Sequence, residues 1–113
     1  MNDGLKTLAR LAGLIRDREL TRLNKLSEQR RKAESELSVS REARMRALSQ
    51  AAPDPAHIAG SVEDWLRLNA AETGRLSRAV SQAAAQAEGQ GVVARRAFGR
   101  ADALERLARR KGR

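Results

Sequence analysis

The chain of 113 residues contains no cysteine and no tyrosine, and it has a single tryptophan and a single phenylalanine. Without cysteine it can form neither a disulfide framework nor a thiolate metal site. Aromatic residues make up 2%, and much of the 41% hydrophobic content is alanine, which buries little area. These shortages argue against a compact domain built around an enclosed pocket.

Long hydrophobic runs are absent as well. The longest uncharged run in the second half, residues 79–87, is far shorter than the roughly 20 residues needed to span a bilayer. The N-terminus leads directly into a charged amphipathic stretch and lacks the apolar core of a signal peptide. We therefore expect a soluble, cytoplasmic protein.

Proline occurs only at Pro53 and Pro55, and each restricts the residue before it away from helix. Elsewhere the 33% of charged residues and the abundance of alanine, leucine, arginine and glutamate favour long helices. We predict a first helix over 3–50, a turn over 51–60, a second helix over 61–109 and a basic tail over 110–113. Ser61 and Asp64 have the spacing of a capping box that would begin the second helix.

A row of mostly apolar residues with alternating three- and four-residue steps runs along the second predicted helix. This spacing keeps the side chains on one stripe that can meet a partner helix. Sustained over this length, it also argues against disorder. The row consists of Leu66, Asn69, Thr73, Leu76, Val80, Ala83, Ala87, Gln90, Ala94, Ala97, Ala101, Leu104 and Ala108.

The first predicted helix carries two apolar stripes in place of one. We predict that a four-residue slip near Glu19, of the kind that locally unwinds a supercoil, joins them. The first stripe consists of Leu5, Leu8, Ala12 and Ile15, and the second of Leu23, Leu26, Ala33 and Leu37.

A short turn between two long helices predicts an all-α fold in which the helices form an antiparallel coiled-coil hairpin. With the turn centred near residue 55, residue i should face approximately position 111 minus i. Leu5 and Leu8 would then lie near Leu104 and Leu107. Because glycine lowers helix stability by about 1 kcal/mol, we expect a kink or local fraying at Gly89–Gly91.

The net charge is +9, and the densest basic cluster lies in the last 19 residues. Such an excess attracts an acidic partner, which can be nucleic acid, anionic lipid or an acidic protein surface. Aromatic residues that could stack on bases are missing, and no nucleic-acid recognition motif is present.

No residue pattern indicates an enzyme, a cofactor or a metal. His57 is the only histidine, and the close acid pairs Glu34/Glu36 and Glu63/Asp64 suit a helix surface or a helix start. Trp65, one turn into the second helix, either covers Leu48 and Val62 at the turn end of the hairpin or contacts a partner.

The helix–break–helix pattern, Trp65 shortly after the break, and the stretch Ala97-Phe98-Gly99-Arg100-Ala101-Asp102-Ala103-Leu104-Glu105-Arg106-Leu107 together give a resemblance to a known group. The chain resembles the FliJ/YscO group, the stalk proteins of flagellar and virulence type III export. The resemblance implies a coiled-coil stalk whose joined ends enter the pore of a hexameric export ATPase. It also implies contacts with the export gate protein and with export chaperones, in the cytoplasm or peripherally at the inner-membrane export apparatus.

Both predicted helix ends would form a basic tip with an apolar seam, which suits insertion into a ring. We predict that the partner-binding residues of this tip are Leu5, Leu8, Arg100, Leu104, Arg106, Leu107, Arg109 and Arg110. Two alternatives stay open: a basic helical hairpin that binds nucleic acid or an anionic surface, and a generic coiled-coil adaptor.

Overall fold

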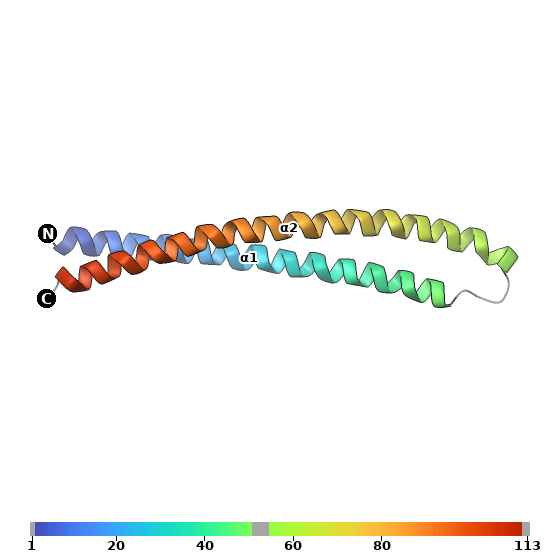
Figure 1. Ribbon diagram of the computed structural model, residues 1–113, viewed down its shortest axis with the longest axis horizontal. Helices are drawn as coiled ribbons and strands as arrows, with labels where there is room; N and C mark the ends of the chain where they lie inside the picture. Colours follow the sequence, from blue (N-terminus) through green and yellow to red (C-terminus); the bar gives the residue numbers. More distant parts are fainter. Residues whose placement is uncertain (1, 51–54, 112–113) are drawn as a thin grey trace. The chain divides into compact units, whose positions relative to one another are not determined.

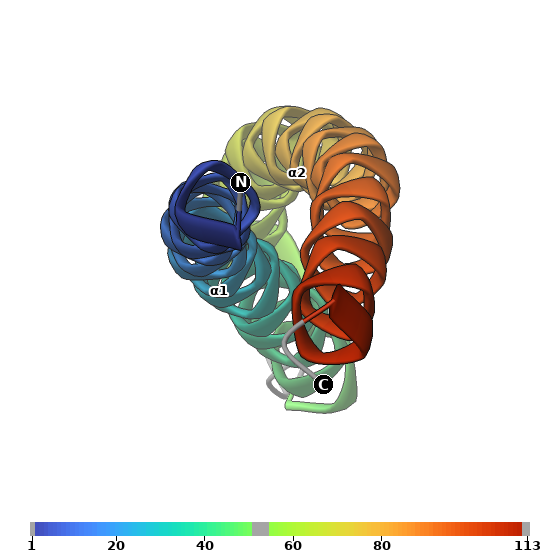
Figure 2. The same cartoon turned by 90° about the vertical axis from the view of Figure 1, so that its left-hand side faces the viewer.

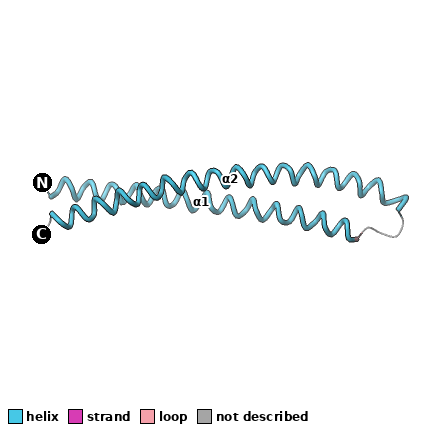
Figure 3. The backbone as a smooth tube through the Cα atoms, in the orientation of Figure 1, coloured by secondary structure: helices cyan, strands magenta, loops and turns pink. Residues whose placement is uncertain are grey.

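The computed structural model describes residues 2–50 and 55–111, with side chains for 3–50 and 60–111. These residues form two helices, α1 (Asn2–Ser49) and α2 (Pro55–Lys111), and contain no strand (Figures 1 and 3). The amide of Gln50 donates to the carbonyl of Arg46, which closes the last turn of α1. The predicted all-α class is confirmed.

The second helix begins at Pro55, not at Ser61 as predicted. Proline is tolerated in the first turn of a helix because its missing N–H would have no intrahelical acceptor there. The capping-box interpretation is therefore wrong, since Ser61 lies inside α2. The helix also continues to Lys111, beyond the predicted end at Arg109. The first residues of the predicted turn, 51–54, and the end of the predicted tail, 112–113, lie outside the described residues.

The helices pack as two compact units, which are described separately. Unit 1 comprises Met1–Glu28 with Ala85–Arg113, and unit 2 comprises Gln29–Ala84. In unit 1 the start of α1 and the end of α2 lie side by side and run in opposite directions (Figures 1 and 2). In unit 2 the guanidinium of Arg44 donates to the carbonyl of Leu66 at 3.4 Å. Both units thus have the antiparallel pairing of a helical hairpin.

Hydrogen bonds between the helices fix their register. Gln90 bonds to Glu19 in unit 1, and Asn69 bonds to Ser40 in unit 2. The predicted rule would place Glu19 opposite position 92 and Ser40 opposite position 71. The observed partners lie within two residues of these positions, so the predicted register is confirmed.

The seam of α2 follows the predicted row without exception. All thirteen positions from Leu66 to Ala108 are buried or half-buried. The most deeply buried apolar members are Leu76, Ala87, Ala94, Ala97 and Ala101. Alanine at these positions lets the two helix backbones approach closely, since each side chain fills little space between them.

The seam of α1 differs from the prediction, because it contains no slip near Glu19. Buried and half-buried residues continue at alternating three- and four-residue steps from Leu5 to Ala47. Arg16 and Glu19 occupy seam positions, whereas Leu8 and Ile15 are 54% and 47% exposed. The steps of α2 are uninterrupted, and α1 keeps matching steps by accepting charged residues into its seam, Arg16 and Glu19 in unit 1 and Arg30 and Arg44 in unit 2.

Gly89–Gly91 does not fray. The segment is part of the continuous helix α2, and the Gln90 side chain at its centre is buried. Its two hydrogen bonds to Glu19 tie this turn to α1. This cross-helix anchor offsets the low helix propensity of Gly89 and Gly91.

Candidate partner-binding surface

A buried polar layer joins the helices in unit 1. The Gln90 side-chain amide donates to the Glu19 carboxylate at 2.6 Å and to the Glu19 carbonyl at 3.0 Å. The Arg18 guanidinium donates to the other carboxylate oxygen of Glu19 at 3.1 Å. These bonds, that from Gln90 first, hold the pKa of Glu19 below its ordinary value, although burial opposes the shift. Glu19 is therefore a buried but charged and hydrogen-bonded group.

A second polar layer lies in unit 2. The Asn69 amide donates to the carbonyl of Ser40 at 3.1 Å and to its hydroxyl at 3.3 Å. The hydroxyls of Ser40 and Thr73 are 2.8 Å apart. The polar residues that interrupt the apolar row of α2 are thus those that bond to α1. Buried polar pairs of this kind specify register in coiled coils.

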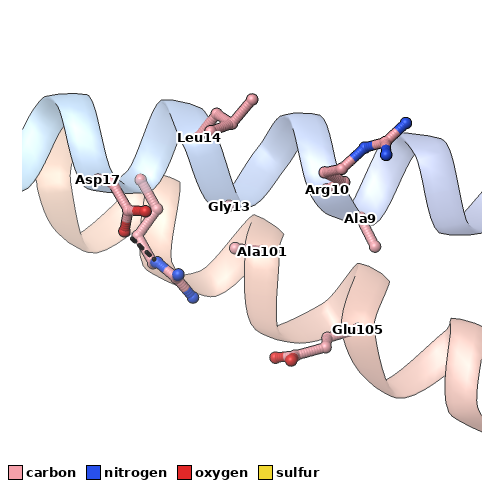
Figure 4. A pocket seen from close by; sticks show the side chains of 8 residues that line it. Ala9, Arg10, Gly13, Leu14, Asp17, Ala101 and Glu105 are labelled. Atoms are coloured by element: carbon pink, nitrogen blue, oxygen red, sulfur yellow. Dashed lines mark hydrogen bonds and ion pairs between the residues drawn. The ribbon is translucent and has the colours of Figure 1, made fainter.

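The remaining residues of unit 1 fall on two sides of the seam. We call the trailing side the set of residues that come directly after a seam position, and the leading side the set that come directly before one. The three- and four-residue steps are continued by one position beyond the seam, to positions 2 and 111, which places Asp3 on the trailing side and Arg110 on the leading side. Three trailing residues, Gly13, Phe98 and Glu105, show that the trailing positions of both helices meet. The Arg16 guanidinium lies 5.5 Å from the Phe98 ring centre. Gly13 and Glu105 line a common hollow of about 320 Å³, in which Gly13 faces Ala101 (Figure 4).

Because the trailing positions share one side, the leading positions of both helices share the opposite side. The apolar residues of the leading side in unit 1 are all exposed, and its charged residues are all basic. The apolar members are Leu8, Leu11, Ile15, Val93, Ala103 and Leu107. The basic members are Arg18, Arg22, Lys25, Arg96, Arg100 and Arg110.

Acidic residues of unit 1 are kept off this side. Glu19 in the seam is the nearest, and it is bonded to Gln90 and Arg18. The trailing side carries Asp3, Asp17, Glu88, Asp102 and Glu105, and Glu28 lies on the outward face of α1. The leading side of unit 1 therefore combines apolar contact area with charge of one sign.

The predicted tip residues separate into three groups. Leu5 and Leu104 are half-buried in the seam. Arg109 forms an ion pair with Glu105 at 3.5 Å, and Arg106 forms one with Asp102 at 3.2 Å. Both pairs lie within α2 and away from the leading side. The structure brings four together on the leading side, namely Leu8, Arg100, Leu107 and Arg110.

Sequence reasoning missed several members of this surface. Leu11 belongs to neither of the two predicted stripes, and Ile15 was assigned to the first of them. Their true position follows only from a seam that passes through Arg16 and Glu19, which hydrophobicity alone does not indicate. Arg96 also belongs to the surface, since it directly precedes Ala97 in the seam of α2, although it was not among the predicted tip residues.

Trp65 is 39% exposed on the leading side of unit 2, directly before the seam residue Leu66. Leu48 directly follows the half-buried Ala47 and so stands on the trailing side. Trp65 and Leu48 therefore stand on opposite sides of the seam, which argues against Trp65 as a cover on Leu48. Val62, the other predicted neighbour of Trp65, is half-buried three residues earlier on α2.

Within the described part of the chain, no group of three or more histidine, cysteine or acidic residues could hold a metal ion. Glu34 and Asp64 form surface ion pairs with Arg30 and Arg67. The side chain of His57 falls outside the described residues. Neither described helix has a stretch apolar enough to cross a membrane.

Comparisons with protein-family models, with curated proteins and with solved structures found no significant match.

Proposed function

We propose that this protein is a non-enzymatic coiled-coil stalk of a type III, flagellar-like, protein export apparatus. In this role unit 1 would enter the pore of a hexameric export ATPase, and the hairpin would link the ATPase to the export gate. The observation that carries the proposal is that both ends of the chain belong to unit 1, where the charged residues on one side of the seam are all basic and the α2 part of the seam is mostly alanine. The sequence resemblance to the FliJ/YscO group supplies the identity of the ring.

The physical requirements of a stalk are rigidity and a defined end. The polar layers at Glu19–Gln90 and Ser40–Asn69 support rigidity, because a sliding hairpin would break their hydrogen bonds. Alanines in the α2 seam keep unit 1 slender, which suits a narrow pore. Basic residues of the last turns, Arg109, Arg110 and Lys111, also interact favourably with the helix dipole, so the end of α2 is supported as helix.

The test is stimulation of a candidate export ATPase by the purified chain. Full-length protein should copurify with the ATPase and raise its turnover, and a chain truncated after Leu104 should lose the effect while staying helical. The removed segment includes Leu107, Arg109 and Arg110, which contribute exposed apolar area and positive field. Stimulation should weaken as salt rises, since exposed charges are screened over about 8–10 Å at physiological ionic strength.

Circular dichroism of the truncated chain is the control for loss of folding. Equal stimulation by the full-length and truncated forms would contradict entry of unit 1 into the ring. No stimulation by either form would contradict the stalk proposal itself.

The concentration of cations on the leading side supports a second candidate, a hairpin that binds nucleic acid. Duplex DNA of random sequence is the probe, because phosphate contacts give strong binding with a steep salt dependence. Such binding without an effect on the ATPase would favour this second function.

A further inference from the structure

The leading side of unit 1 has the composition of an interface with a third helix. Next to the seam, at the inner positions, lie the apolar residues Leu8, Ile15, Val93 and Leu107 together with Arg22 and Arg100. One row further out lie four cations, Arg18, Lys25, Arg96 and Arg110, and two apolar residues, Leu11 and Ala103. Apolar inner positions with a charged rim are typical of helix–helix interfaces.

We propose that this side of unit 1 binds an acidic amphipathic helix of a partner protein, which completes a three-helix bundle. The partner would present an apolar stripe to the inner positions and carboxylates to the basic rim. Residues 8–25 of α1 span roughly 27 Å, so a partner helix of about 18 residues covers the surface. This inference does not depend on the proposed stalk function.

Charge complementarity selects an acidic partner over a second copy of the chain. No acidic residue lies on the leading side of unit 1, so two copies meeting through this side would oppose cations to cations. Arg96 and Arg100 form no ion pair with any described residue, and their charges are available to a partner.

The arrangement also favours a helix over a flat lipid surface. The outer row would reach a bilayer first, and four of its members are cations, whereas the inner apolar residues lie closer to the seam. Phe98, the aromatic residue of unit 1, stands on the trailing side, although aromatic rings usually anchor helices at a lipid interface. A convex helix can contact both rows together.

A designed peptide can serve as the probe. The peptide has three heptads, with leucine at the two positions of each heptad that form its apolar stripe and glutamate at the positions on both sides of this stripe. A matched peptide has lysine in place of the glutamates. Titration of fluorescently labelled peptide with the full-length chain should show saturable binding of the glutamate peptide and none of the lysine peptide. Affinity should fall at least tenfold between 50 and 300 mM salt.

Two charge-reversal variants locate the binding site. Arg96→Glu/Arg100→Glu changes the leading side, and Arg95→Glu/Arg109→Glu makes the same change in net charge on the trailing side. We expect at least a tenfold loss of affinity for the first variant and less than a threefold loss for the second. The apolar contribution is tested by Leu11→Gln/Ile15→Gln, with Leu14→Gln on the outward face as its control. All these side chains are exposed, and circular dichroism would confirm that the variants stay folded.

Equal losses for the leading-side and trailing-side variants would overturn the proposal, because binding would then follow net charge alone. Binding to vesicles of anionic phosphatidylglycerol, or to duplex DNA, with no binding of the glutamate peptide would overturn it in favour of those ligands. A dimer in sedimentation that Arg96→Glu/Arg100→Glu dissociates would also overturn it, since a second copy would then occupy this side. These outcomes are separable from ATPase stimulation, which the peptide titration does not measure.

Discussion

Replacing Gly89 and Gly99 by alanine should stabilise the protein. Both residues lie inside α2, and a Cβ added at either position meets no atom within 4 Å beyond its own helical surroundings. Alanine is favoured over glycine by about 1 kcal/mol in a helix interior, because glycine loses more backbone entropy on folding. No steric cost opposes this gain at either site.

The two gains should add, since the residues lie about 15 Å apart along the helix and share no partner. The expected increase is therefore about 2 kcal/mol in the free energy of unfolding. For a chain of this size 1 kcal/mol raises the melting temperature by roughly 4 °C, so the double variant should melt about 8 °C higher. Thermal unfolding followed by circular dichroism measures this shift, and urea unfolding measures the free energy.

Ala85→Gly is the matched control, because Ala85 is an exposed residue of α2 in the same unit. It should lower stability by about as much as one glycine replacement raises it. A melting temperature that is unchanged or lower for Gly89→Ala/Gly99→Ala would refute the reasoning. Such a result would mean that these glycines are not in open helical positions, or that glycine is needed there for a close contact between helices.

Three further predictions concern the seam. Leu76 is only 4% exposed, so Leu76→Ala should lower the free energy of unfolding, measured in urea, by about 2–4 kcal/mol. Leu68 is 72% exposed on the same helix, so the control Leu68→Ala should change this free energy by less than about 0.5 kcal/mol. Ala94→Leu should destabilise by about 1–3 kcal/mol, because the close approach of the helices leaves no room for the larger side chain; an unchanged urea midpoint would count against a tight alanine seam. Stability should fall as pH drops below about 4.5, the ordinary pKa of Glu19. The hydrogen bond from Gln90 is the main cause that lowers the pKa of this carboxyl in the folded protein. The carboxyl therefore takes up a proton at a higher pH in the unfolded chain than in the folded one, and acid favours unfolding. Gln90→Ala should reduce this loss when urea unfolding is compared at pH 7 and pH 4, and an identical pH dependence in both proteins would contradict the assigned role of Gln90.

The seam of α2 could be predicted from its residues because apolar side chains occupy most of its positions. The polar interruptions at Asn69, Thr73 and Gln90 did not obscure it, since the steps on both sides of each interruption kept the same phase. The register could be predicted from the position of the prolines, because a short turn leaves little freedom in how two helices align.

The seam of α1 could not be predicted in the same way. Hydrophobicity favours Leu8 and Ile15 as seam residues over Arg16 and Glu19, but the structure places them the other way round. The acceptance of Arg16 and Glu19 depends on Phe98 and Gln90 of α2, which lie far away in the sequence. A pattern read along one helix contains no information about such partners.

This difference explains why the leading side of unit 1 was only partly foreseen. A seam drawn through Leu8 and Ile15 assigns these two residues to the contact between the helices and so removes them from the apolar residues available to a partner. Once the seam passes through Glu19, the same apolar residues become available to a partner, and they lie beside Arg96 and Arg100. The assignment of one buried carboxylate thus decides which face of the protein is free.

The two polar layers also act together in selecting one alignment of the helices. Glu19 and Ser40 are separated along α1 by the same number of residues that separates Asn69 from Gln90 along α2, so a single register satisfies both pairs. A slip of one heptad would bring Glu19 opposite alanine in the seam and leave its carboxylate without the Gln90 amide. The buried carboxylate would keep its bonds from Arg18 on the same helix but lose its donor on α2, which is costly, whereas the alanine and leucine pairs of the seam would tolerate the slip. The apolar seam therefore supplies attraction between the helices, and the polar layers determine which residues of α1 and α2 share the leading side.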